Sequence, residues 1–217
     1  MEKNNFIEFA TLISDYLSCD IESEKLISNF HNTSIDDSNK NCVVYVYEGK
    51  KDLAVLDMDR IAKNGYKQKK GATDKDSLIN TADAFIISNN NQWFFIEFKN
   101  SKMNDVSKSL KDNIIKKAYS NWYMLLDIIF SMNDLGIKYS GFDYSNPIDF
   151  AKKHVTYIVV CRTENNPISY KRIRECELIG TKYTPQFMLR LKDYMFKDAY
   201  LYTQDFFERK FVDCFIY

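Results

Sequence analysis

The sequence predicts an α/β fold in which a central mixed β-sheet is flanked by helices. Two short apolar runs, 84–87 and 93–98, are joined by the polar segment 88–92, which is typical of two strands and a hairpin loop. Apolar residues then recur every three or four positions over 106–130, a pattern that predicts a long helix with one apolar stripe. The apolar run 156–161 is bounded by polar residues, as expected of a buried central strand.

Composition indicates an ordered globular protein. The chain has 217 residues, which suits a single domain over 1–217, and 45% of them are hydrophobic. Thirty basic residues balance thirty acidic ones, which argues against a uniformly basic surface but not against a local basic groove. Five scattered cysteines without a Cys-x-x-Cys pair indicate a reducing compartment and no zinc site. No signal peptide or membrane-length apolar run is found, so we expect a cytoplasmic protein without a membrane partner.

The elements before the central hairpin follow from local patterns. Residues 5–18 have the spacing of an amphipathic helix, and 25–30 suggest a short helical piece. The β-branched and aromatic run 42–47 predicts the first strand, with 53–58 as its hairpin partner. Asp57 or Asp59 is then expected to cap a helix of one or two turns.

The elements after the long helix complete the α/β pattern. Residues 136–149 are predicted to be a loop. Helices are expected over 169–176 and 185–194, the second started by a Thr-Pro pair. A strand over 199–203 and a terminal helix over 204–213 end the chain.

Three charged residues stand out in the central hairpin. Asp83 opens its first strand, and Glu97 and Lys99 close its second. Side chains alternate along a strand, so Glu97 and Lys99 share one side, and antiparallel pairing can bring Asp83 beside Glu97. Two neighbouring carboxylates repel each other unless a cation lies between them. Mg²⁺ suits this role because it prefers one or two carboxylates and acts on phosphate esters.

The pattern of Asp83, thirteen residues, Glu97, any residue and Lys99 resembles the PD-(D/E)XK nuclease superfamily. The proline in the name of that superfamily is absent, because Ala82 precedes Asp83. The resemblance implies a restriction-endonuclease-like αβββαβ core with N- and C-terminal helical additions. It also implies Mg²⁺ or Mn²⁺ held by Asp83, Glu97 and the backbone carbonyl of Phe98, with Lys99 orienting the attacking water or stabilising charge on the phosphorus. The expected activity is hydrolysis of nucleic acid, with DNA favoured.

The tripeptide Glu-x-Lys alone does not identify this site, because it also occurs at 48–50 and 208–210. The first of these lies beside a turn. The second lies in a predicted helix, where residues two apart do not share a face. Only Glu97 is a strand residue that follows a second strand carrying an aspartate.

Two further residues are candidates for the same site. In the superfamily a glutamate from an early helix sometimes reaches the metal, and Glu8 could play that part; the alternative is a solvated helix face. Lys117 lies in the first half of the long helix, on a face that adjoins the apolar stripe. It could contact the scissile phosphate or the Asp83 side of the site, or it could simply solvate the helix.

The most basic segment of the chain lies immediately before Asp83 and lacks apolar periodicity. Two interpretations remain open, a solvated loop and a mobile arm that contacts phosphates of nucleic acid beside the cleavage site. Its candidate nucleic-acid-binding residues are Lys67, Lys69, Lys70 and Lys75.

A second hypothesis keeps the fold without the chemistry. The many aromatic residues could form a surface for a protein partner or a homodimer interface, and zero net charge suits a protein partner better than bulk DNA. An immunity or antitoxin-type protein of a mobile element is one form of such a binding module.

Overall fold

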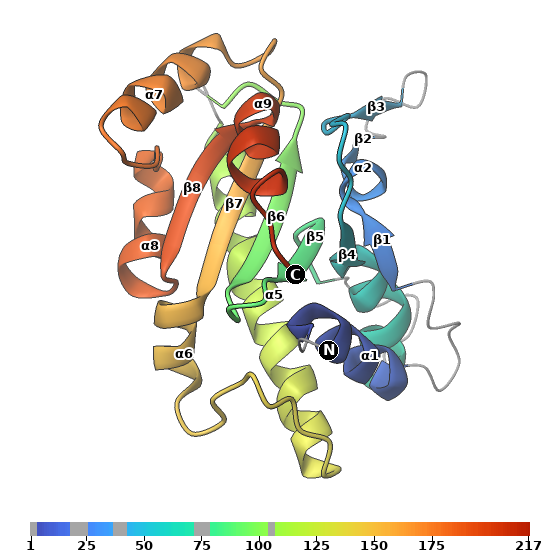
Figure 1. The fold of residues 1–217 in the computed structure, drawn as a ribbon. Helices are drawn as coiled ribbons and strands as arrows, with labels where there is room; N and C mark the ends of the chain where they lie inside the picture. Colours follow the sequence, from blue (N-terminus) through green and yellow to red (C-terminus); the bar gives the residue numbers. More distant parts are fainter. Residues whose placement is uncertain (1–3, 18–25, 37–42, 72–78, 104–106) are drawn as a thin grey trace.

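In the part of the chain that the structure describes, six strands form one mixed sheet in the order β1-β4-β5-β6-β7-β8 (Figure 1). The structure is a computed structural model that describes residues 4–17, 26–36, 43–71, 79–103 and 107–217. The strands are β1 (Ile27–Asn29), β4 (Ala54–Asp57), β5 (Ala84–Ile87), β6 (Trp93–Lys99), β7 (Val155–Cys161) and β8 (Asp198–Thr203). Neighbours from β1 to β6 are antiparallel, whereas β6, β7 and β8 are parallel. Helices flank this sheet, so the predicted α/β class with a mixed sheet is confirmed.

The hairpin predicted from 42–47 and 53–58 is not formed. β3 (Val44–Tyr45) pairs instead with β2 (Ile35–Asp36) in a separate two-stranded sheet. β4 is paired along both edges, by β1 and by β5. A strand has two hydrogen-bonding edges, so β4 has none left for β3. The start of the predicted first strand, Cys42, lies outside the described residues.

A second correction concerns 25–30, which the sequence predicts to be helical. Ile27–Asn29 form β1 at the edge of the sheet, and helix α2 (Phe30–Thr33) begins only after it. Asn29 caps this helix, because its side chain accepts a hydrogen bond from the Asn32 N–H at 2.8 Å. A strand of three residues is too short to show a period of its own in the sequence.

The segment after β4 is helical for about three turns rather than one or two. Three short helices follow each other without a break: α3 (Met58–Arg60), η2 (Ile61–Tyr66) and α4 (Lys67–Lys69). Asp57 is the predicted cap, since its side chain accepts from the Arg60 N–H at 2.9 Å. Gly65 approaches α1 so closely that a Cβ there would lie 2.8 Å from Leu17 Cδ1. Tertiary packing therefore extends the helix, and the predicted basic loop is wrong as far as Lys69.

Two helices predicted from apolar periodicity are confirmed. α1 (Asn5–Leu17) buries Phe9, whose ring lies 5.7 Å from that of Phe85 in β5. α5 (Lys108–Asp134) begins after Ser107, whose side chain accepts from the Leu110 N–H at 3.3 Å. The apolar stripe of α5 is buried from Ile114 onward, and Leu110 is partly buried.

The central hairpin and the buried strand that follows are also confirmed. β5 and β6 pair with Ala84 opposite Ile96, and the Ser88 N–H donates to the Gln92 carbonyl at 2.9 Å to close the loop. β7 is buried along its whole length between β6 and β8. α6 (Pro147–His154) replaces the end of the predicted loop, because Asn146 caps it and Pro147 is its first residue.

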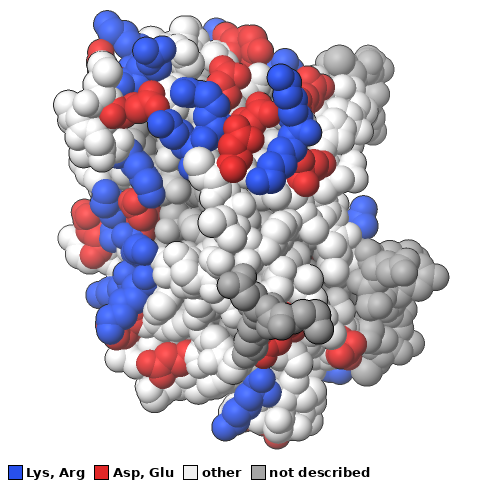
Figure 2. Space-filling view, viewed as in Figure 1, with Lys and Arg blue, Asp and Glu red and all other residues white. Residues whose placement is uncertain are grey.

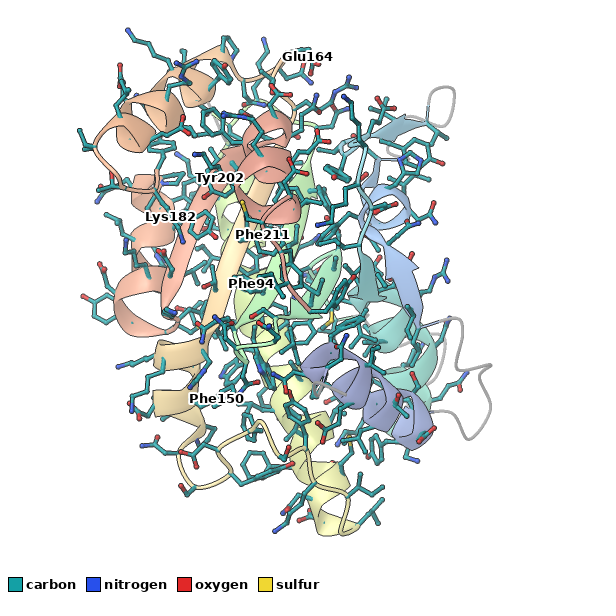
Figure 3. All side chains as sticks on the ribbon, in the orientation of Figure 1. Phe94, Phe150, Glu164, Lys182, Tyr202 and Phe211 are labelled. Carbon is teal, nitrogen blue, oxygen red and sulfur yellow. The ribbon has the colours of Figure 1, made fainter. Side chains whose placement is uncertain are left out.

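The C-terminal third supplies the predicted helices and the last strand. The helices are α7 (Pro167–Leu178), η3 (Gln186–Met188), α8 (Leu189–Tyr194), α9 (Gln204–Phe207) and η4 (Glu208–Val212). η4 packs on β6, with the rings of Phe211 and Phe94 4.9 Å apart (Figure 3). Phe94 and Glu97 differ by an odd number of positions and so point to opposite faces of β6. α9 and η4 therefore cover the face of the sheet that α5 does not.

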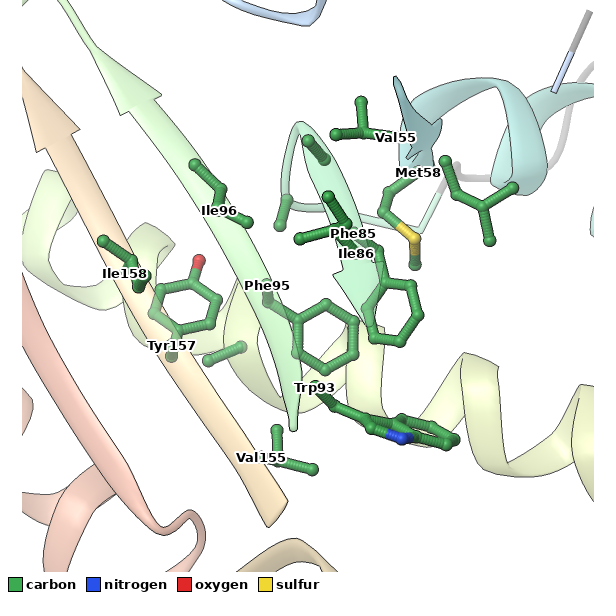
Figure 4. Close-up of a cluster of buried hydrophobic side chains, with 14 of the residues drawn as sticks. Val55, Met58, Phe85, Ile86, Trp93, Phe95, Ile96, Val155, Tyr157 and Ile158 are labelled. Carbon is green, nitrogen blue, oxygen red and sulfur yellow. The ribbon is translucent and has the colours of Figure 1, made fainter. Parts of the chain in front are cut away.

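Aromatic side chains fill the core beneath the hairpin (Figure 4). Trp93, Phe95 and Phe85 are fully buried, with the Phe85 ring 4.9 Å from that of Phe95 and 5.4 Å from that of Trp93. This packing fixes the register of β5 against β6. Among the described residues, no helix combines the length and the apolar character needed to cross a membrane.

Candidate functional site

Asp83 and Glu97 lie next to each other where the β5–β6 ladder ends. Ala84 pairs with Ile96, and the Asp83 N–H donates to the Ile96 carbonyl at 3.0 Å. At the next hydrogen-bonding position of β6 the acceptor is the Asp83 side chain instead of a backbone carbonyl. Its Oδ2 accepts a hydrogen bond from the Phe98 N–H at 2.6 Å. The hairpin register thus fixes one carboxylate beside the other, as the sequence predicts.

Two lysines contact this pair of carboxylates. Glu97 Oε1 accepts from Lys117 Nζ at 2.7 Å and also contacts Lys99 Nζ. Lys117 Nζ lies 3.6 Å from Asp83 Oδ1 as well, so its ammonium bridges the two carboxylates. We refer to Asp83, Glu97, Lys99 and Lys117 as the carboxylate–lysine cluster. All four were candidates from the sequence, and they come from the start of β5, from β6 and from α5.

The cluster lies largely out of solvent. The Glu97 side chain is 0% exposed, those of Lys99 and Lys117 are 17% exposed, and that of Asp83 is 22% exposed. Burial, and then the charge of Glu97, raise the pKa of Asp83 far above its ordinary value. Burial acts to lower the pKa of Lys117, but the charges of Glu97 and Asp83 outweigh it and the pKa is raised. Lys117 is therefore held as a cation between the two carboxylates.

One buried oxygen of the cluster accepts no hydrogen bond from the described part of the chain. Glu97 Oε2 is buried without a partner among the described residues, although a buried carboxylate oxygen ordinarily accepts at least one. The Phe98 carbonyl points to the same edge of β6 as its N–H, which faces Asp83. The Asp83 carboxylate, Glu97 Oε2 and the Phe98 carbonyl are hard oxygen ligands of the kind that Mg²⁺ and Mn²⁺ prefer. These residues fit a divalent cation, which would compete with the Lys117 ammonium.

The cluster does not hold a larger set of metal ligands. No group of three or more His, Cys, Asp or Glu side chains suited to a metal ion occurs within the described residues. A divalent cation here would rest on two carboxylates, a carbonyl and water. Mg²⁺ commonly keeps several waters and takes only one or two carboxylates from a protein.

A polar cleft of about 340 Å³ leads from solvent to Asp83. Its other lining residues are Asn32, Thr33, Ile35, Asp57, Asp59, Arg60, Lys63 and Asn64. Asp59 is held by Thr81 and by Lys63, whose Nζ lies 2.8 Å from Asp59 Oδ2. Asp57 forms an ion pair with Arg60 at 3.0 Å. The sequence analysis identified Asp57 and Asp59 only as helix caps; their place beside the cluster follows from the long-range pairing of β4 with β5.

Glu8 is not brought to the cluster. The N-terminus of α1 lies at the hairpin loop, where the Asn5 side chain donates to the Asn89 carbonyl at 2.8 Å. Glu8 Oε1 accepts there from Ser140 Oγ at 3.4 Å. Asp83 and Glu97 lie at the opposite end of β5, so the structure does not support Glu8 as a ligand of the same metal.

The basic residues before Asp83 also lie away from the cluster. Lys70 forms an ion pair with Asp127 of α5 at 2.5 Å, and Lys69 Nζ lies 4.6 Å from the centre of the Tyr16 ring. Lys67, the first residue of α4, also interacts with another group and is not a free cation. Lys69 and Lys70 are therefore held against α1 and α5 rather than extended over the site as a mobile arm. Lys75 lies outside the described residues.

Comparison with known proteins gives no relative. No family model, no curated protein and no solved structure matches this chain.

Proposed function

We propose that this protein is a Mg²⁺- or Mn²⁺-dependent nuclease of the PD-(D/E)XK type, with DNA as the favoured substrate. The observation that carries the proposal is the carboxylate–lysine cluster at the end of the β5–β6 ladder, in which Glu97 Oε2 has no hydrogen-bond partner in the part of the chain that the structure describes. A buried carboxylate costs solvation free energy, and packing in the core does not require one. Buried charges with perturbed pKa values are concentrated at functional sites.

The order of the elements supports the same proposal. A helix (α1), three antiparallel neighbours (β4, β5 and β6), a long helix (α5) and a parallel strand (β7) follow in the sequence. This agrees with the αβββαβ core that the resemblance implies, with Asp83 directly before its second strand, Glu97 and Lys99 on its third strand and Lys117 on the long helix. Because many α/β proteins share such an order, the cluster and not the fold carries the functional argument.

Each residue of the cluster would have a distinct part in hydrolysis. Asp83, Glu97 and the Phe98 carbonyl would hold the cation. The cation, when bound, would polarise the phosphate and lower the pKa of a water molecule. Lys99 would orient that water or stabilise the charge that develops on phosphorus. Lys117, released from its bridge between the carboxylates, would be free to contact a phosphate oxygen.

The cleft at Asp83 supplies a route for the substrate. Arg60, Lys63 and Asn64 line it and can donate hydrogen bonds to phosphate oxygens. Asp57 and Asp59 neutralise part of this charge, through the pairs that they form with Arg60 and Lys63. A bound phosphate would therefore have to compete with these pairs for the two cations.

Cleavage of DNA tests the proposal directly. Purified protein with Mg²⁺ or Mn²⁺ should nick or cut supercoiled plasmid, and Glu97→Ala and Lys99→Ala should each reduce the rate by about a hundredfold or more. Matched controls are Asp149→Ala, which removes an exposed carboxylate, and Lys116→Ala, which removes an exposed lysine next to Lys117. Equal cleavage by Glu97→Ala and by wild-type protein would refute the assignment.

A second candidate function is favoured by one specific observation. Lys117 already occupies the position between the carboxylates, and with Lys99 it balances the charge of Asp83 and Glu97 without a metal. The cluster would then be the remnant of a nuclease site in a protein that binds nucleic acid or another protein. This candidate predicts that wild-type protein binds no Mn²⁺ in calorimetry and cleaves no DNA, even at high protein concentration.

A further inference from the structure

A basic pocket lies between α5 and the η3–α8 segment, apart from the cleft at Asp83. Its volume is about 280 Å³. The lining residues are Lys108, Lys111, Asp112, Ile115, Phe187 and Arg190. Two elements far apart in the sequence thus contribute three cations and one carboxylate to the same space.

Three cations without a carboxylate partner line one space here, whereas other such cations of the described ranges, for example Lys116 and Arg174, lie outside it. Elsewhere on the surface basic and acidic side chains are interspersed, as over α7 and α9 in Figure 2, where Lys210 Nζ lies 2.7 Å from Glu177 Oε1. Within the described ranges, by contrast, Lys108, Lys111 and Arg190 have no carboxylate at ion-pair distance. The protein has no net charge, so an excess of cations here does not reflect a generally basic composition. The three cations outnumber Asp112, the one carboxylate that lines the pocket, so the pocket attracts an anion.

The floor of the pocket is apolar. Ile115 is buried, and Phe187 is half-buried and packs against the core. Cations around an aromatic floor suit an anion that also carries a flat apolar group, which a bare inorganic ion lacks. A nucleotide has both, because its phosphate pairs with lysine or arginine and its base stacks on an aromatic ring. The volume lies just below the usual range of small-molecule pockets, so it admits about one nucleotide rather than a duplex.

The position of the pocket on α5 connects it to the cluster. Lys108 and Lys111 precede Lys117 on this helix by nine and six residues, which correspond to about 14 and 9 Å of helix rise. One strand of nucleic acid advances about 3.4 Å per nucleotide along a duplex, so this span equals about three to four nucleotides. The positive end of the α5 dipole lies at the same end of the helix and adds to the attraction for phosphate.

We infer that this pocket binds one nucleotide of a nucleic-acid strand, a few positions away from the bond that the cluster would cleave. Lys108, Lys111 and Arg190 contact the phosphate, and Phe187 stacks on the base. The inference rests on the proposed function, because it names a second contact of the same substrate. The pocket would hold the strand near the cleft but would not take part in the chemistry.

Binding without metal tests this inference separately from cleavage. Fluorescence anisotropy of a labelled single-stranded oligonucleotide is measured in EDTA, so that no hydrolysis occurs. The double variant Lys108→Ala/Arg190→Ala should lose about tenfold in affinity, and its log–log salt slope should fall by up to about 0.7, because the pocket neutralises one phosphate of the strand. Phe187→Leu should lose about fivefold because the stacking ring is removed.

A matched control keeps the loss of charge constant. Lys116→Ala/Arg174→Ala removes one exposed lysine from α5 and one exposed arginine from α7, both outside the pocket. Its affinity should stay within about twofold of wild type, because only scattered charge is lost. Thermal melting of each variant verifies folding. An equal loss in the control double variant would overturn the inference, and so would an equal loss of affinity for polyglutamate, which has no bases.

The two proposals can fail separately. If Lys108→Ala/Arg190→Ala binds the oligonucleotide as tightly as wild type does and wild-type protein cleaves plasmid, the inference about the pocket is refuted and the proposed nuclease function is supported. If the pocket variants lose affinity for the oligonucleotide but wild-type protein does not cleave DNA, the inference about the pocket is supported and the proposed nuclease function is refuted.

Discussion

Glu97 and Asp149 each form an ion pair with a lysine at nearly the same N–O distance. The distance is 2.7 Å from Lys117 Nζ to Glu97 and 2.6 Å from Lys153 Nζ to Asp149. Their surroundings differ, because the Glu97 side chain is 0% exposed and that of Asp149 is 44% exposed. An exposed pair contributes little, since water and salt screen it. A buried pair must offset the desolvation of both partners, and apolar residues of similar volume often stabilise a fold equally well. The distance alone therefore does not distinguish the two ion pairs, whereas their burial does.

The largest expected effect is the loss of stability when the buried ion pairs of Glu97 are broken. Glu97→Gln removes the charge that Lys99 and Lys117 share, and leaves two mostly buried ammonium groups without the carboxylate that lies closest to Lys117. The free energy of unfolding should fall by about 3–5 kcal/mol, the usual cost of breaking a buried ion pair. Urea unfolding in EDTA measures it. A loss no larger than that of Asp149→Asn would mean that the buried and the exposed pair are equivalent.

The next effect concerns the competition between Lys117 and a divalent cation. Lys117→Met removes the ammonium between the carboxylates and keeps much of the side-chain volume, so Mn²⁺ should bind about tenfold more tightly. Calorimetry measures the affinity, and Lys116→Met is the control from the neighbouring exposed lysine. If Lys117→Met weakens Mn²⁺ binding, the lysine assists the metal rather than competing with it.

The raised pKa of Asp83 predicts how the free energy of unfolding depends on pH. Burial and the charge of Glu97 raise the pKa of Asp83 from 3.8 to about 7 in the folded protein, while Lys117, Lys99 and the Phe98 N–H oppose this shift. Between these values the folded state binds more protons than the unfolded state. The free energy of unfolding should therefore decrease from about pH 4 to pH 7, by up to about 1.4 kcal/mol per pH unit from this group, and level off above.

Comparison of wild type with Asp83→Asn isolates this contribution. Urea unfolding in EDTA at several pH values gives the difference in stability between the two proteins. That difference should change with pH only between the two pKa values. A difference that does not change with pH would show that Asp83 titrates normally.

The smallest expected effect is at the exposed pair. Asp149→Asn should change the melting temperature by less than about 1 °C, and added salt should remove even this difference. Differential scanning calorimetry at low and high ionic strength measures it. A shift of several degrees would mean that surface pairs contribute to this fold as much as buried ones do.

The parts of the fold that the sequence predicts are those decided by short-range patterns. The β5–β6 hairpin joins strands five residues apart, so its register, and with it the neighbourhood of Asp83 and Glu97, follows from local alternation. The helical period of 106–130 likewise predicts that Lys117 lies on a face of α5 next to the apolar stripe. The pairing of β4 with β1 and β5, rather than with 42–47, depends on contacts between distant segments and has no local signal.

The same limit explains what was missed at the site. Asp57 and Asp59 enter the cleft because β4 lies beside β5, and Glu8 lies elsewhere because α1 meets the hairpin at its loop. The helix over Lys67–Lys69 is held by packing on α1 and α5, which a charged sequence does not reveal.

Calorimetric titration of Mn²⁺ into wild type, Asp83→Asn and Glu97→Gln tests the central claim most directly, that these two carboxylates jointly hold a divalent cation. We predict one site in wild-type protein and loss of binding in both variants, with Asp149→Asn unchanged. Binding that persists in both variants, or no binding to wild-type protein at millimolar Mn²⁺, would contradict the claim and leave the cluster as a buried ion-pair network.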